Sequence, residues 1–218
     1  CYFNYDEIPY SSIGNQVITI SFQYVISESE MLSQRKFIDD TLNPVLAKVD
    51  ANWSDTEKAL YVHDWLVSNF MYDYRLFETP GTENHDIYGF LKDGIGVCQG
   101  YAYTYMYMMR KLGLESYMAI NDTDVDNDGE ADISGHGWNV VKIDGNWYHV
   151  DATYDDPILG ESFHYDYVGE VSHDKFLLSD EQIAANDKNY EHYGFFVPNV
   201  DEQIVCNEYT GDDLWRNA

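Results

Sequence analysis

The sequence predicts a folded protein that mixes helices with strands, and three observations support this. Residues 16–25 alternate between apolar and polar side chains, as is typical of a strand. Apolar residues recur with helical spacing over 54–71 and again over 98–112. An Asp144-Gly145 pair between two apolar runs predicts a β-hairpin over residues 136–153. With 44% hydrophobic residues, of which many are aromatic, the chain has enough apolar surface for a packed core.

The helices are expected in the first half of the chain. One is expected over residues 30–49. The next, over 54–71, has a clear start, because Ser54 and Glu57 have the spacing of a capping box. A third helix follows a glycine-rich turn, so that Cys98 lies at or near its N-terminus.

The remaining segments are expected to be strands and loops. Residues 116–120 predict a short strand before the hairpin, whereas residues 73–84 and 121–134 have the composition of loops. The region from 154 to 218 is expected to be rich in loops, with one short ordered segment, KFLLSDEQIA, at residues 175–184.

The charge of the chain excludes two classes of partner. It has 12 basic and 39 acidic residues, for a formal net charge of −27. Such a surface repels phosphate backbones and anionic lipids, so we expect binding neither to nucleic acid nor to acidic membrane surfaces. No apolar run approaches the roughly 20 residues that a membrane-spanning helix needs. We therefore expect no transmembrane segment.

The three cysteines are Cys1, Cys98 and Cys206, and their odd number leaves at least one thiol without a partner in the chain. A Cys1–Cys206 disulfide would join the two ends and leave Cys98 free. Alternatively, Cys1 is the lipidated first residue of a bacterial lipoprotein, or the chain is a fragment. The acidity, the many tyrosines and an acidic loop together predict an extracellular or cell-surface protein.

The predicted hairpin brings His136 and Asp151 close together. A two-residue turn at 144–145 places Trp138 opposite Asp151 and His136 opposite Thr153. His136 and Asp151 are then diagonal neighbours on one face of the hairpin, about 7–8 Å apart at the backbone. The carboxylate would accept a hydrogen bond from one imidazole nitrogen and leave the other nitrogen for a nucleophile.

Cys98 is the predicted nucleophile. A helix N-terminus and a neighbouring imidazolium both stabilise a thiolate, and Cys98 gains the second if its helix packs on the His136 face of the sheet. The backbone N–H of Cys98 is a natural donor to an oxyanion, and the flanking glycines would allow a substrate backbone to approach. Tyr88 and Gln99 are candidates for a second donor, and Trp138 is expected to limit the access of water to the site.

These residues match a family. The segments GVCQGYA (96–102), GHGWNVVKIDGNWYHVDATYDDP (135–157) and KFLLSDEQI (175–183) resemble the bacterial transglutaminase-like superfamily, as does the preceding helix EKALYVHDWLVSNFMYD (57–73). The family motif usually reads GHAWN where this chain has GHGWN. The resemblance implies a papain-like α+β fold, in which the helix that carries the cysteine packs on an antiparallel sheet. It also implies Cys98, His136 and Asp151 as nucleophile, base and orienting carboxylate.

The resemblance further implies a single domain over residues 1–218. The core would span 53–201, preceded by an extension of 1–52 and followed by a tail of 202–218. Active members of the family attack a carboxamide or peptide carbonyl with a thiolate and form a thioester, which an amine or water then resolves. The expected function is therefore acyl transfer or hydrolysis on a protein or peptide, such as a cell-wall peptide, with no organic cofactor. The alternative is a catalytically silent surface module that retains the fold for adhesion or binding.

An acidic loop precedes His136. Its carboxylates alternate before a glycine turn, a pattern that can converge on a hard cation such as calcium. The expected ligands are Asp124, Asp126, Asp128, Glu130 and Asp132. The loop lacks the final glutamate of an EF-hand, because Gly135 occupies that position. The alternative is a solvated acidic loop without a metal.

Two further histidine patterns are given structural interpretations. His63 and Asp64 are adjacent on a predicted helix, so their side chains should point about 100° apart and not form an acid–base pair. A zinc site that uses Cys98 and His136 is not expected, because no local cluster of cysteines and histidines supports it. His149 shares the predicted face of His136 and is expected either to line the cleft or to pack within it.

Overall fold

The computed structural model describes residues 26–73, 84–121, 135–156, 170–185, 192, 194–198, 200–201 and 203–211. The predicted strand at 16–25 lies outside these residues. Within the described part of the chain, no helix is both long and apolar enough to cross a membrane.

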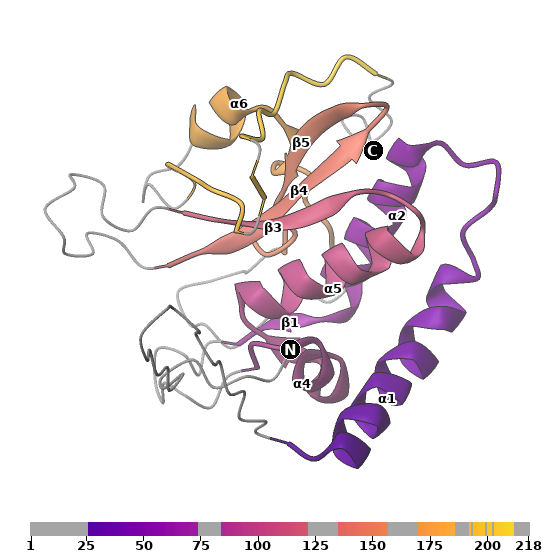
Figure 1. The fold of residues 1–218 in the computed structure, drawn as a ribbon. Coiled ribbons are helices and arrows are strands. Elements are labelled where there is room, and N and C mark those ends of the chain that lie inside the picture. The colour runs from indigo at the N-terminus through magenta and orange to yellow at the C-terminus, as the bar shows by residue number, and fades with distance from the viewer. Residues whose placement is uncertain are drawn as a thin grey trace, which may run out of the picture.

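The fold combines helices with strands in the order shown in Figure 1. The helices are α1 (Glu28–Leu46), α2 (Asp55–Asn69), α4 (Ile87–Asp93), α5 (Cys98–Lys111) and α6 (Asp180–Ala185). The strands are β1 (Met71–Tyr72), β2 (Ile95–Gly96), β3 (Ser116–Ile120), β4 (Gly137–Ile143), β5 (Asn146–Val150) and β6 (Phe176–Leu178).

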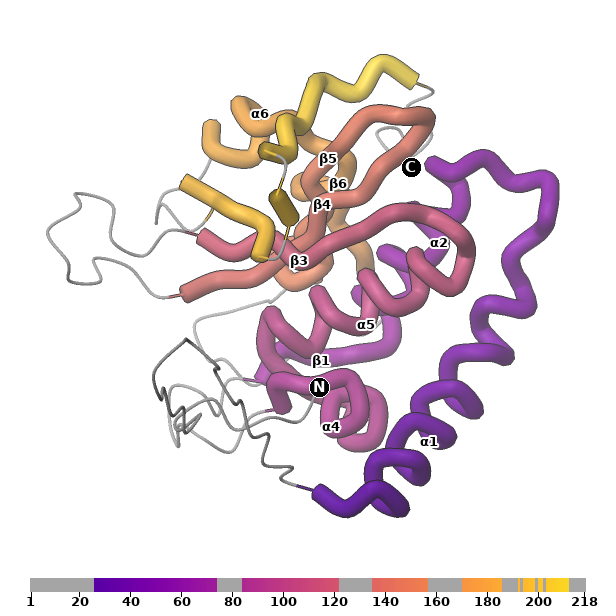
Figure 2. Tube along the Cα trace, in the orientation of Figure 1, coloured from indigo at the N-terminus to yellow at the C-terminus, as the bar shows by residue number. Residues whose placement is uncertain are grey.

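The central sheet is antiparallel, with the strand order β3-β4-β5-β6, and β1 and β2 form a separate parallel pair. Helix α5 lies against one face of the central sheet, and α1, α2 and α4 surround α5 on that side (Figures 1 and 2). Helix α6 lies on the other side of the sheet, as do Ile204 and Cys206 of the C-terminal segment, whereas Tyr209 packs against the main core and bonds to Thr56 of α2. The expected α+β fold, with the cysteine-bearing helix packed on an antiparallel sheet, is confirmed.

The hairpin has the predicted register. Pairing runs from Ile143 opposite Asn146 outward to Asn139 opposite Val150. The turn residues Asp144 (φ 49°) and Gly145 (φ 85°) both have positive φ, as a type I′ turn requires. This local signal is therefore enough to set which hairpin residues face each other.

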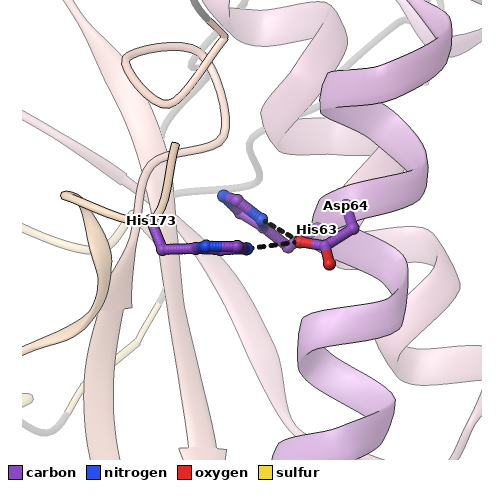
Figure 3. Close-up of side chains that lie close together, drawn as sticks. All are labelled: His63, Asp64 and His173. Carbon is purple, nitrogen blue, oxygen red and sulfur yellow. Dashed lines mark hydrogen bonds and ion pairs between the residues drawn. The ribbon is translucent and has the colours of Figure 1, made fainter. Parts of the chain in front are cut away.

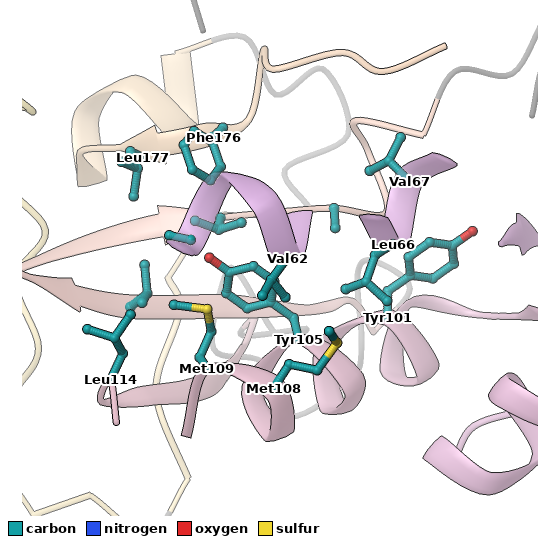
Figure 4. Close-up of a cluster of buried hydrophobic side chains, with 14 of the residues drawn as sticks. Val62, Leu66, Val67, Tyr101, Tyr105, Met108, Met109, Leu114, Phe176 and Leu177 are labelled. Carbon is teal, nitrogen blue, oxygen red and sulfur yellow. The ribbon is translucent and has the colours of Figure 1, made fainter. Parts of the chain in front are cut away.

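The main core lies between α5 and the sheet. The buried side of α5, which includes Tyr101, Tyr105 and Met108, packs against the sheet and against α2 (Figure 4). The sheet contributes Val141 and Val150 to this cluster. A second cluster on the opposite face contains Ala119, Trp138, Val140, Ile183, Ile204 and Cys206. The sheet thus carries a core on each face.

The start of α2 is confirmed and α1 is slightly displaced. The amide of Glu57 donates to Ser54 Oγ (3.2 Å), and the amide of Ser54 donates to Glu57 Oε2 (2.7 Å), which completes the capping box. Helix α1 begins and ends earlier than the predicted 30–49. Met31 and Phe37 of α1 are exposed at 40% and 36%.

Candidate active site

Cys98 is the first residue of α5 and carries a half-buried free thiol. The thiol lies close enough to the imidazole of His136 to contribute to the raised pKa of that imidazole. Cys98 lies in the first turn of α5, where the backbone amides have no carbonyl partner within the helix. The thiol therefore lies where the helix dipole and the imidazole both act on it.

His136 lies directly before β4 and is held at both its backbone and its ring. Its amide donates to Asn121 Oδ1 (2.8 Å), and its carbonyl accepts from the amide of Asn121 (3.3 Å). Its ring Nε2 lies 2.7 Å from Asp151 Oδ2. Since Nε2 is used by Asp151, Nδ1 is the nitrogen left for Cys98. The structure thus brings the three predicted triad residues together.

The route by which Cys98 reaches His136 differs from the expectation. We expected α5 to pack on the face of the sheet that carries His136. Instead, α5 packs on the Val141 face, while Trp138 belongs to the core on the other face. His136 precedes the first residue of β4, so it lies at the end of the sheet. The N-terminus of α5 meets it there, which places only Cys98, and not the body of the helix, beside the imidazole.

Asp151 is buried and every oxygen of its side chain is used. Oδ1 accepts from the amides of Thr153 (3.0 Å) and Tyr154 (3.2 Å). Oδ2 accepts from His136 and also from Nε2 of His192, at 2.8 Å. Four hydrogen bonds thus fix the orientation of a carboxylate that itself orients the proposed base.

His192 is the residue that the sequence analysis missed. It is buried, shares Oδ2 of Asp151 with His136, and lies edge-to-face with the His136 ring, with 5.2 Å between ring centroids. The Tyr154 ring packs against both imidazoles at 5.2 Å. His192 belongs to the region that was expected to be rich in loops, where no periodicity or motif marked it.

The electrostatics of the buried pair favour charged forms of both partners. Burial alone would lower the pKa of His136, but the charge and hydrogen bond of Asp151, together with the neighbouring Cys98 thiol, raise that pKa to about 10. Burial alone would raise the pKa of Asp151, but the His136 charge and the hydrogen bonds from both imidazoles hold that pKa well below its usual range. At neutral pH the site therefore contains an imidazolium beside a carboxylate.

Trp138 packs beside the triad as predicted. Its indole stacks on the His136 ring, with centroids 5.6 Å apart and the planes inclined by 16°. Its Nε1–H donates to Nδ1 of His149 (2.9 Å), whose Nε2 bonds to Asp180 (2.9 Å). His149 is fully buried, so of its two expected roles it packs and does not line an open cleft.

The candidates for a second oxyanion donor occupy different surroundings. Gln99 lies next to Cys98 in the first turn of α5, and its side-chain oxygen contacts Nδ1 of His85 (2.8 Å). Tyr88 packs edge-to-face on Phe37 of α1, with ring centroids 5.4 Å apart. These contacts place Gln99 beside Cys98 and Tyr88 at the interface of α1 and α4.

The glycines that flank Cys98 make room for a neighbouring helix. A Cβ at Gly96 would lie 2.6 Å from the Phe90 ring, and a Cβ at Gly100 would lie 2.9 Å from the same ring. Both glycines therefore allow the close approach of a buried phenylalanine from α4, and the expected approach of a substrate backbone stays a prediction. The packing of Phe90 fixes the start of α5, and with it the position of Cys98.

Several expectations lie beyond the described residues. The acidic loop, with its ligands Asp124, Asp126, Asp128, Glu130 and Asp132, lies outside them, so calcium binding there stays a prediction. Cys206 has a buried, free thiol, and its expected partner Cys1 lies outside the described residues. The domain boundaries likewise stay predictions.

Comparison with known protein families gives one match for this chain. Residues 45–152 match the family model of the transglutaminase-like superfamily. Among solved structures, the chain is similar to a TGase, with a TM-score of 0.47 and 14% identity over 70% of this chain and 39% of that one. A candidate cysteine protease from Cytophaga hutchinsonii gives a TM-score of 0.38 and 20% identity over 55% of this chain and 37% of its own.

A candidate protease from Parabacteroides distasonis ATCC 8503 gives a TM-score of 0.39 and 17% identity, over 56% of this chain and 23% of its own. The chain thus spans at most 39% of the length of these solved structures. A comparison with curated proteins found no match.

Proposed function

Because residues 45–152 belong to the transglutaminase-like superfamily, we propose that the protein is a thiol-dependent enzyme that acts on amide bonds of proteins or peptides. The observation that carries the proposal is the continuous contact from Cys98 through His136 to Asp151. A nucleophile, a base and an orienting carboxylate in this order are the parts that thiol acyl transfer needs.

In the first half of the proposed reaction, the thiolate of Cys98 attacks the carbonyl carbon of a carboxamide or peptide bond. The carbonyl electron pair moves to oxygen, where the free amides at the start of α5 stabilise the developing negative charge. His136 then gives its Nδ1 proton to the departing nitrogen as the C–N bond breaks. The products are a thioester on Cys98 and a released amine or ammonia.

In the second half, an acceptor resolves the thioester. An amine or a water molecule gives a proton to His136 and attacks the thioester carbonyl. The C–S bond breaks, and Cys98 is released as a thiolate beside the imidazolium, ready for another cycle. An amine acceptor gives acyl transfer and water gives hydrolysis, so the same residues serve both reactions. Asp151 stabilises the imidazolium in both halves.

The test is a reaction of the purified chain with a glutamine-containing peptide, with and without a labelled primary amine. Mass spectrometry follows amine incorporation, ammonia-releasing hydrolysis, and an acyl adduct on the Cys98 peptide. Cys98→Ser should abolish all three products, whereas Cys206→Ser, which removes a buried thiol outside the site, should leave them. If a panel of glutamine and peptide substrates gave no adduct and no product, the proposed reaction would be wrong.

Alkylation tests the thiol without knowledge of the substrate. Iodoacetamide at neutral pH should modify Cys98 well before Cys206. The Cys98 sulfur is partly exposed, whereas the Cys206 thiol is buried and burial raises its pKa. His136→Ala should slow the modification of Cys98 and leave that of Cys206 unchanged. Equal rates for the two cysteines, or no effect of His136→Ala, would instead favour a silent module. The expected surface location stays a prediction.

A further inference from the structure

A second cluster of histidines and carboxylates lies away from Cys98, between α2 and the segment that precedes β6. His63 Nδ1 lies 3.0 Å from Asp64 Oδ1, and His173 Nε2 lies 2.8 Å from the same oxygen (Figure 3). The sequence analysis expected His63 and Asp64 to point apart. They meet because the Asp64 carboxylate turns back toward the imidazole to bridge two histidines.

The far side of His63 is also fixed. Its Nε2 lies 3.0 Å from Asp155 Oδ2, and both atoms are fully buried. The amide of Lys175 donates to both oxygens of Asp155, at 2.9 and 3.1 Å. A carboxylate on one ring nitrogen fixes the tautomer so that the other nitrogen can bind a metal, an arrangement that metal-binding histidines nearly always show.

The atoms have nearly the spacing that zinc requires. The His63 nitrogen, the Asp64 oxygen and the His173 nitrogen all lie within 4.8 Å of one another. Zinc binds nitrogen and oxygen at about 2.0–2.2 Å, so ligands at two corners of a tetrahedron are about 3.3 Å apart. The two contacts to Asp64 then need to lengthen by only a few tenths of an ångström.

We propose that His63, Asp64 and His173 form a binding site for zinc. Two imidazoles and one carboxylate suit zinc better than calcium or magnesium, which prefer oxygen ligands. The side chains of Asp64 and His173 are 39% and 18% exposed, so the ion reaches the site from their side and keeps a fourth position for water. Zinc replaces the proton that Nδ1 of His63 otherwise donates to Asp64.

The site would have a structural consequence for the triad. Zinc would join α2 to the segment before β6, and Asp155 connects the same site to the turn that carries Asp151. The amide of Asp155 donates to the carbonyl of Asp151 (3.2 Å), one turn away. The proposed ion therefore stabilises the region around the active site, and the proposal does not depend on which reaction that site performs.

The experiment is a calorimetric titration of zinc chloride into the metal-stripped full chain in a Cys98→Ser background, which removes the reactive thiol. One zinc per chain should bind, and the melting temperature should rise with zinc concentration. His173→Ala and Asp64→Asn should each abolish this site, whereas His85→Ala, which removes an exposed histidine, should leave it. Circular dichroism checks that each variant is folded.

Zinc could instead bind at either of two other groups of possible ligands, and the experiment distinguishes these cases from the proposed site. Zinc at His149, Asp180 and Cys206 would include a thiolate, so cobalt substitution would give an intense sulfur-to-cobalt band, and that result overturns the proposal. Zinc beside Asp151 and His192 would survive His173→Ala, which also overturns it. The absence of zinc binding to the chain without ligand substitutions would also overturn the proposal.

Asp155 orients His63 and does not contact the proposed ion, so Asp155→Asn should weaken zinc binding by about 10- to 100-fold without abolishing it.

Discussion

Replacing Asp151 by asparagine keeps the shape of the side chain and changes what it can accept. In the native site, Oδ2 receives N–H groups from His136 (2.7 Å) and His192 (2.8 Å), and Oδ1 receives two backbone amides. An asparagine oxygen that keeps the backbone amides places its NH₂ group toward both imidazoles. His136 must then accept at Nε2 and carry its proton on Nδ1, pointing at Cys98.

That tautomer cannot take a proton from the thiol, so the expected loss is large. The same change in a Ser–His–Asp triad lowers turnover by about 10⁴-fold. This corresponds to about 5 kcal/mol of lost transition-state stabilisation. Two charge-assisted hydrogen bonds disappear at once, each worth about 1.5–3 kcal/mol of folding stability, so the variant should also unfold more easily than the wild type.

The assay compares turnover and iodoacetamide alkylation for the wild type and for Asp151→Asn. Asp180→Asn is the matched control, because Asp180 also bonds an imidazole, that of His149, outside the triad. The control should retain near-native rates. Turnover of Asp151→Asn within about tenfold of the wild type, in a folded protein, would refute the assigned role of the carboxylate.

Three other predictions concern stability. Because the pKa of His136 is raised from 6.5 to about 10, the folded state binds the imidazole proton more tightly than the unfolded state. The resulting contribution to the free energy of unfolding should be complete below pH 6.5 and should be lost as the pH rises through about 10, as measured by urea unfolding. Gly100→Ala places a Cβ 2.9 Å from the fully buried Phe90 and should destabilise the fold by about 1–3 kcal/mol, whereas Gly135→Ala, with no atom within 4 Å, should be nearly neutral; chemical denaturation compares them. Ser54→Ala removes the capping box and should cost about 1 kcal/mol in the same assay, and a change below a few tenths would contradict the capping role.

The predictable parts of the fold depend on short-range signals. Asp144-Gly145 determines a two-residue turn, and the turn determines the hairpin register, so the proximity of His136 and Asp151 follows from the local sequence 136–151. The capping box fixes the start of α2 in the same local way. Where the geometry is set within one element or one turn, the sequence alone predicts the structure.

The missed features depend on packing between distant segments. His192 reaches Asp151 across 41 residues of sequence, from a region without hydrophobic periodicity. The face of the sheet on which α5 packs is set by which apolar side chains complement each other, and both faces of β4 are apolar. The glycines beside Cys98 accommodate Phe90, a contact that no spacing in the sequence indicates.

The paired hydrogen bonds between Asn121 and His136 join the two ends of the segment that separates β3 from β4. Because these two hydrogen bonds hold His136, its position does not depend on the length of the chain between residues 121 and 136. Since closing a longer loop costs only about 0.6 kcal/mol for each doubling of its length, residues can be added or removed there at small expense. A change in the length of that segment should therefore leave His136 in place beside Asp151.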